Sequence, residues 1–168
     1  MMGFIAITEE RMKILRKEKK LVKKLEDLTD VKIRLTENVE IECEDPIKLM
    51  CIKSVVKAFG RGFDFEDALY LLDDKYELCI IDAKDFAGKS TKRLEELRGR
   101  VIGTKGKSKT IIEKLADVKI SIYGKTISII GEWDSVQSAR QAVCMLLEGR
   151  KHDGVYKFLE ENIKKTKY

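Results

Sequence analysis

Hydrophobic positions in this chain follow two periods, one typical of strands and one typical of helices. A short apolar run near the start, "FIAI", predicts a strand. Apolar residues then recur at helical spacing over residues 9–29, and two alternating segments, "VKIRL" and "VEIEC", follow with "TEN" between them. Such a pair predicts a β-hairpin. A helix should come next, with Asp45 as its N-cap and Pro46 in its first turn.

The same pattern occurs a second time. Val31-Lys32-Ile33 returns as Val118-Lys119-Ile120, an offset of 87 residues. In the second copy "ELCIID" predicts a strand, residues 90–103 and 107–116 predict helices, and "VKISIYGKTISII" predicts a hairpin. A last helix should run from Asp134, as N-cap, to Gly149. Each copy therefore has the order β-α-α-β-β-α, which predicts an α+β fold with a three-stranded sheet packed against three helices.

This layout sets the domain boundaries. We expect a first domain over residues 1–62 and a second over residues 76–168. Residues 63–75 have the spacing of an amphipathic connecting helix. A C-terminal helix that ends in a basic tail should follow the second copy.

Composition narrows the class of protein. Apolar residues make up 43% of the 168 positions, enough for a real core, and no run reaches the roughly 20 apolar residues of a membrane span. The start lacks the long apolar region of a signal peptide, so we expect a cytoplasmic protein. A charged content of 38% with only two Asn and two Gln predicts a hyperthermophilic source. Cysteine spacing fits no zinc pair, so we expect reduced thiols and no metal or cofactor at Cys43, Cys51, Cys79 and Cys144.

Basic residues concentrate in residues 11–34 and 98–125, with an acidic stretch between them. The net charge of +5 is modest, but this distribution indicates contact with a polyanion at defined places. A solvated, thermophile-type surface would account for part of the same pattern.

Two glycines lie between the predicted helices of the second copy, in "GTKG" from Gly103 to Gly106. Glycine has no Cβ and lets a phosphodiester backbone approach the protein chain. The N-terminus of the following helix favours negative charge. This combination is typical of the KH module, in which a GxxG loop grips about four nucleotides of single-stranded RNA.

The chain resembles the KH family over nearly its whole length. "VIGTKG", with Ile112 six residues after the second glycine, fits the family pattern, except that Lys109 replaces the usual apolar residue. That departure resembles a narrower group, the Dim/Pno-type KH proteins of small-subunit ribosome assembly. The resemblance implies two tandem type I KH domains that bind small-subunit rRNA near its 3′ end, without catalysis. It also implies two protein partners, the endonuclease that trims that end and the alpha subunit of translation initiation factor two.

The predicted RNA contacts fall in the second copy. The loop should grip the sugar–phosphate backbone, basic residues should supply charge, and four isoleucines should border the base groove. These residues are Gly103, Thr104, Lys105, Gly106, Lys107, Ser108, Lys109, Arg98, Arg100, Ile102, Ile112, Ile120 and Ile122. The first copy has Arg16 to Lys19 in place of the loop, which favours a scaffold or protein-binding role, although its lysines can still touch RNA.

Two other functions stay open. In an adaptor, the acidic strand Glu40, Glu42, Glu44 would dock a basic partner and RNA binding would be secondary. The segment Ala83–Ser90, "AKDFAGKS", formally fits a relaxed phosphate-loop pattern, but it lacks the glycine-rich nest and a downstream magnesium-binding Asp. Trp133 is expected to pack beside a helix cap, and His152 to lie on the surface beside a turn.

Overall fold

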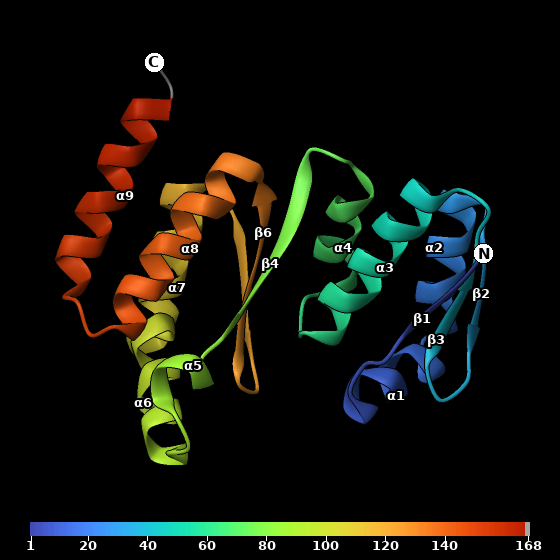
Figure 1. The fold of residues 1–168 in the computed structure, drawn as a ribbon, viewed down its shortest axis with the longest axis horizontal. Helices are drawn as coiled ribbons and strands as arrows, with labels where there is room; N and C mark the ends of the chain where they lie inside the picture. Colours follow the sequence, from blue (N-terminus) through green and yellow to red (C-terminus); the bar gives the residue numbers. More distant parts are fainter. Residues whose placement is uncertain (167–168) are drawn as a thin grey trace. The chain divides into compact units, whose positions relative to one another are not determined.

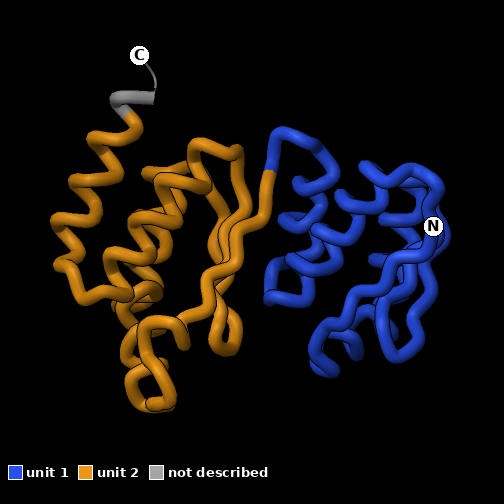
Figure 2. Tube along the Cα trace, in the orientation of Figure 1, with its two compact units in different colours: residues 1–76 blue, residues 77–168 orange. Residues whose placement is uncertain are grey.

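The computed structural model describes residues 1–166, and their side chains as far as residue 163. The chain forms two compact units, Met1–Tyr76 and Glu77–Tyr168 (Figure 2). Both contain the order β-α-α-β-β-α. The predicted duplicated α+β fold is therefore confirmed.

In unit 1 the sheet carries its helices on one face (Figure 1). Its strands pair antiparallel in the order β1-β3-β2, so that the last strand of the copy lies in the centre. Ile33 and Ile41 are buried on the helix-facing side, whereas Lys32 and Arg34 alternate outward. The elements are β1 (Met2–Ile5), α1 (Glu9–Lys17), α2 (Lys19–Thr29), β2 (Lys32–Leu35), β3 (Val39–Glu42) and α3 (Pro46–Gly60).

Local signals account for most ends of these elements. Asp45 is the N-cap of α3, as predicted, and its carboxylate accepts a hydrogen bond from the backbone N–H of Ile47 at 2.9 Å. The helical stretch over residues 9–29 is broken by a single residue, Glu18, with φ −102° and ψ 72°. The junction between α1 and α2 therefore has no loop of its own.

The predicted connecting helix is shorter than expected. Residues 63–75 contain one α-helical turn, α4 (Phe65–Ala68), which continues as the 3-10 turn η1 (Leu69–Leu72). Both turns pack on α3 and bury Phe65, Ala68 and Leu71. This segment is thus part of the hydrophobic structure of unit 1.

Unit 2 repeats the architecture with one additional long helix. Its sheet has the order β4-β6-β5, and its helices lie on one face (Figure 1), where α9 packs along α7 and α8. Leu97, Ile112, Ile129 and Leu146 are fully buried in its core. The elements are β4 (Tyr76–Asp82), α5 (Lys84–Ala87), α6 (Thr91–Ile102), η2 (Thr104–Gly106), α7 (Lys107–Ala116), β5 (Lys119–Tyr123), β6 (Thr126–Glu132), α8 (Trp133–Leu147) and α9 (His152–Thr166). The basic tail predicted after α9 lies outside the side chains that the structure describes.

The duplication extends to individual hydrogen bonds. The Glu26 carboxylate accepts from the N–H of Ile33 at 3.0 Å, and Glu113 accepts from Ile120 at the same distance. Asp30 and Asp117, which end α2 and α7, both adopt the left-handed conformation. Since both pairs differ by 87 residues, the sequence repeat corresponds to a structural one.

The predicted N-cap of the last helix of the second copy is wrong. Helix α8 begins at Trp133, and no side chain caps it, so Asp134 lies within the first turn and is not the N-cap. Trp133 is 62% exposed and does not pack as a staple. Relative to the matching aspartate, the helix starts two residues earlier than in unit 1, and this removes Asp134 from the capping position.

Within the described residues, no helix is long and apolar enough to cross a membrane, and no group of three or more His, Cys, Asp or Glu could hold a metal ion. All four cysteines are free thiols. Cys43 is buried, whereas the other three are only partly so.

Candidate nucleic-acid interface

The loop between α6 and α7 has a backbone that few residues can adopt. Gly103 has φ 74° and ψ 173°, a region essentially restricted to glycine. The 3-10 turn follows, in which Lys105 is left-handed at φ 55°, and Gly106 has φ 75°. Three positive φ values in four residues turn the chain sharply from α6 into α7.

The two glycines serve different purposes. A Cβ on Gly103 would lie 2.7 Å from both the backbone nitrogen and the Cβ of Ser108, so the first glycine is required for the loop to fold against α7. A Cβ on Gly106 would meet no atom within 4 Å. The space beside Gly106 is therefore open to an approaching backbone.

The first turn of α7 carries positive charge without an internal counter-ion. No side chain caps the helix, and the turn holds no acidic residue. Lys105 and Lys107 are exposed, Lys109 is half-buried, and none of them forms an ion pair with a described residue. Together with the helix dipole, these groups favour an anion at the loop.

The two predicted arginines differ in their hydrogen bonds, although Arg100 lines a hollow together with Gly103, Lys107 and other residues. Arg100 donates from Nε to the main-chain oxygen of Leu146 at 2.9 Å and from Nη2 to that of Arg150. Its guanidinium thus satisfies carbonyl groups at the C-terminal end of α8. Arg98 is half-buried, and its Nε has no hydrogen-bond partner among the described residues. Arg100 therefore has a structural role in unit 2, and its contact with RNA stays a prediction.

Only two of the four predicted isoleucines are accessible. Ile112 and Ile120 are 0% and 3% exposed and lie in the core, so they support the groove from below and cannot touch a base. Ile102 and Ile122 are partly exposed. These two side chains are the ones that could border unstacked bases.

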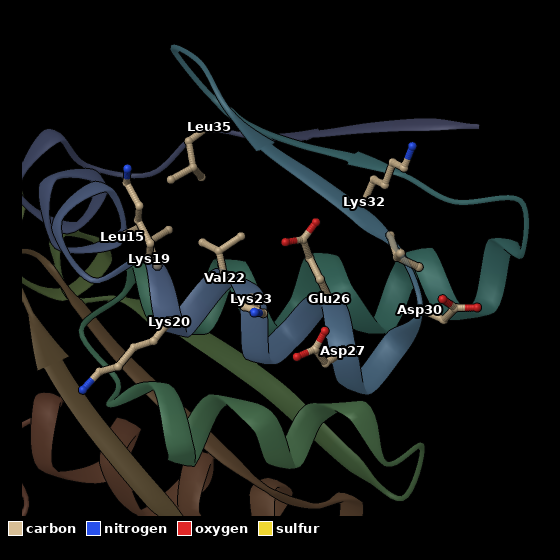
Figure 3. Close-up of a pocket in the computed structure, with 11 residues that line it drawn as sticks. Leu15, Lys19, Lys20, Val22, Lys23, Glu26, Asp27, Asp30, Lys32 and Leu35 are labelled. Carbon is tan, nitrogen blue, oxygen red and sulfur yellow. The ribbon is translucent and has the colours of Figure 1, made fainter.

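A groove between helix and strand is visible in unit 1. It runs between α2 and β2 and is lined by apolar Leu15, Val22 and Leu35 (Figure 3). Lysines from the start of α2 lie toward one end and carboxylates toward the other. The remaining lining residues are Lys19, Lys20, Lys23, Glu26, Asp27, Asp30, Val31 and Lys32.

The 87-residue repeat identifies the matching positions in unit 2. Leu15, Val22 and Leu35 correspond to Ile102, Lys109 and Ile122. Lys19 corresponds to Gly106, the open position of the loop. In unit 2 the positions equivalent to this lining therefore adjoin the glycine loop, whereas in unit 1 the groove has no glycine loop beside it.

The phosphate-loop alternative finds little support. Residues Lys84–Ala87 form a turn of helix, α5, and leave no open loop to wrap a phosphate. The Ser90 hydroxyl accepts a hydrogen bond from the N–H of Arg93 at 3.1 Å as the N-cap of α6. The segment Ala83–Ser90 therefore forms one helical turn and the N-cap of the next helix.

The acidic strand is partly balanced within unit 1. Glu40 lies 3.9 Å from Arg34 and accepts a hydrogen bond from the hydroxyl of Thr36 at 3.0 Å. Glu42 is flanked by Met2 and Lys32 on the neighbouring strands. The strand offers less free negative charge than its sequence suggested.

Sequence reasoning missed a second group of residues next to the loop. His152, expected on the surface, begins α9 and donates from Nε2 to the main-chain oxygen of Arg100 at 2.8 Å. Tyr156 follows one turn later, and the two rings meet edge to face at 6.1 Å. Only the close approach of α9 to α6 brings these rings to the loop, and no local pattern could have revealed it.

Comparison with known proteins shows the family of the chain. A family model described as a eukaryotic-type KH domain (KH-domain type I) matches residues 77–164, just over half of the chain. A KH domain-containing protein of Methanocaldococcus jannaschii is 45% identical over 124 residues, covering 74% of this chain and 54% of the relative. The RNA-binding protein pno1 of Ixodes scapularis is 31% identical, covering 68% and 50%. The chain thus spans about half the length of these curated relatives.

A solved structure matches nearly the whole chain. The chain is similar to a protein in the crystal structure of the a/eIF2alpha–aDim2p–rRNA complex from Pyrococcus horikoshii, with a TM-score of 0.89 and 34% identity. The match covers 98% of this chain and 95% of that one. The chain therefore belongs to the type I (eukaryotic-type) KH-domain family, in the group that contains the Pno1 and Dim2 proteins.

Proposed function

We propose that this protein binds single-stranded small-subunit rRNA near its 3′ end, without catalysis, through the Gly103–Gly106 loop of unit 2. The observation that carries the proposal is the open space beside Gly106, in front of a helix start with no internal counter-ion. A phosphodiester needs such an approach, and Lys105 and Lys107 supply mobile charge beside it.

The choice of RNA rests on the relatives. One neighbour was crystallised with rRNA, and other relatives are named as pre-rRNA-processing proteins. Bases would lie along Ile102 and Ile122, where an apolar border suits unstacked rings. Base choice depends on contacts along this border, whereas the loop itself binds the backbone of any sequence.

The experiment is fluorescence anisotropy of the full chain with labelled RNA of the 3′-terminal small-subunit sequence. The matched control is a scrambled RNA of the same length and composition, measured at the same salt concentrations. We expect the 3′-terminal RNA to bind at least tenfold more tightly, and the affinity for both to fall as salt rises. Equal affinities for the two RNAs would contradict rRNA as the specific target. Absence of binding to both RNAs would contradict RNA binding as the function.

We further propose that the chain binds the alpha subunit of translation initiation factor two, the protein that shares the crystal with the matched archaeal structure. Size-exclusion chromatography of the purified alpha subunit with this chain, with and without RNA, tests the contact. Co-elution is expected, and separate elution in both conditions would contradict it. The endonuclease partner and the cytoplasmic location stay predictions from the sequence.

A further inference from the structure

A second hollow lies beside the glycine loop, on the side of α9. It is lined by Gly99 and Gly103 from the end of α6, by Lys107 and Ser108 from the start of α7, and by His152 and Tyr156 from α9 among others. Except for Lys107, it shares no residue with the unit 2 positions that match the groove of unit 1. The hollow is therefore distinct from that groove and adjoins the loop on the side of α9.

Gly99 has no structural explanation. It lies inside helix α6, where glycine is less favourable than alanine. Its backbone is helical, and a Cβ would meet no atom within 4 Å. Neither strain nor crowding requires glycine here, and the missing side chain leaves the backbone of α6 open on this side.

A buried hydroxyl gives a second, independent indication. Ser108 lines the hollow at 1% exposure, and its Oγ has no hydrogen-bond partner among the described residues. Buried polar groups without a partner are rare in folded proteins. Ser108 lies in the uncapped first turn of α7, where an incoming anion or hydroxyl would satisfy it.

The opposite wall is aromatic and fixed in place. The hydrogen bond from His152 to the Arg100 carbonyl holds the start of α9 against α6, and the ring of Tyr156 stands edge to face with that of His152. Glu96, Arg100, Thr104 and Asp153 also line the hollow, and the Arg100 guanidinium is bound to main-chain oxygens at the end of α8. The carboxylates of Glu96 and Asp153 favour donors such as ribose hydroxyls and base amino groups.

We propose that this hollow binds the nucleotide directly next to the clamped segment on the same RNA strand. Its phosphate lies at Lys107 and Ser108, its sugar passes over Gly99, and its base lies against Tyr156. The inference rests on the proposed RNA clamp and extends it to an additional nucleotide. An aromatic wall suits a base of any identity, so the site adds affinity more than sequence preference.

The test compares RNA length in the full chain. Anisotropy is measured with an RNA of about four nucleotides, the length that a KH loop grips, and with RNAs extended by about two nucleotides at the 5′ or the 3′ end. One extension should bind at least fivefold more tightly, the lower range of base–aromatic stacking. Gly99→Leu should fill the hollow and abolish this gain while raising the melting temperature.

Two further variants separate binding from folding. Gly154→Leu is the matched control, because Gly154 is a helical glycine of α9 with open surroundings that does not line the hollow. It should keep the full gain. Tyr156→Leu retains apolar volume but removes the ring, and should lower the gain at unchanged affinity for the short RNA.

The outcomes distinguish this inference from the proposed function. If neither extension increases affinity, or if the gain survives Gly99→Leu, the hollow does not hold RNA, although the clamp stands. If the wild type binds none of the RNAs, the clamp and the inference both fail.

Discussion

A Cβ on Gly103 would lie 2.7 Å from the backbone nitrogen of Ser108, because the loop folds back directly onto the first turn of α7. The loop therefore packs against α7, the helix that it precedes. Gly106, three residues later, has no such neighbour. One glycine of the pair is explained by the fold, and the other by space for a ligand.

Alanine substitutions should separate the two glycines. Gly103→Ala must leave a conformation available only to glycine and must also relieve the contact with Ser108, so we expect a loss of about 3 kcal/mol in the free energy of unfolding. Gly106→Ala carries only left-handed strain, about 1–2 kcal/mol. Guanidinium unfolding measures both. Equal losses would contradict the assigned roles.

The backbone of Lys105 is left-handed, with φ 55°, a conformation that is energetically unfavourable for lysine. Asn tolerates this conformation better, so Lys105→Asn should leave stability unchanged or raise it by up to about 1 kcal/mol. The same variant should weaken RNA binding and reduce the slope of log affinity against log salt by about 0.7, the contribution of one phosphate contact in a single strand. An unchanged salt slope would show that Lys105 does not touch a phosphate.

Arg100 should matter for stability and not for the salt dependence of RNA binding. Arg100→Met removes two hydrogen bonds to main-chain oxygens of Leu146 and Arg150, and we expect a loss of about 1.5–3 kcal/mol in unfolding free energy. Lys107→Met is the comparison, since that side chain is exposed and unpaired among the described residues. It should lower the salt slope with little effect on stability. The reverse pattern would restore Arg100 as an RNA contact.

Burial raises the pKa of the Cys79 and Cys144 thiols above their ordinary value of 9.0, although Arg140 partly offsets the effect. The folded chain therefore keeps protons that the unfolded chain releases above that pH. This contribution to stability is complete below pH 9 and is lost as pH rises further. Unfolding at about pH 7.5 and about pH 10 should show a smaller pH-dependent loss in the Cys79→Ala, Cys144→Ala double variant than in the wild type. If both proteins lose the same stability between the two pH values, other groups are responsible for the pH dependence.

Local signals made much of the fold predictable. The element order, the cap at Asp45 and the loop at Gly103–Gly106 depend on residues close in sequence. The role of Arg100 was not predictable, because its partners lie 46 and 50 residues away. Periodicity placed Ile112 and Ile120 on an apolar face but could not tell whether that face meets the core or the groove. The prediction for Trp133 was wrong because α8 begins at Trp133 itself, two residues earlier than a cap at Asp134 indicates.

The RNA clamp is tested most directly at Gly106, with two side chains of equal size. Gly106→Asn and Gly106→Asp both tolerate the left-handed backbone and both occupy the open space, but only aspartate adds a negative charge where a phosphate should lie. The measurement is the anisotropy of labelled 3′-terminal rRNA with each variant, after unfolding curves have shown that both fold equally well. We predict that Gly106→Asp binds at least tenfold more weakly than Gly106→Asn, about 1.4 kcal/mol. Equal affinities of the two variants would contradict a phosphate at this loop.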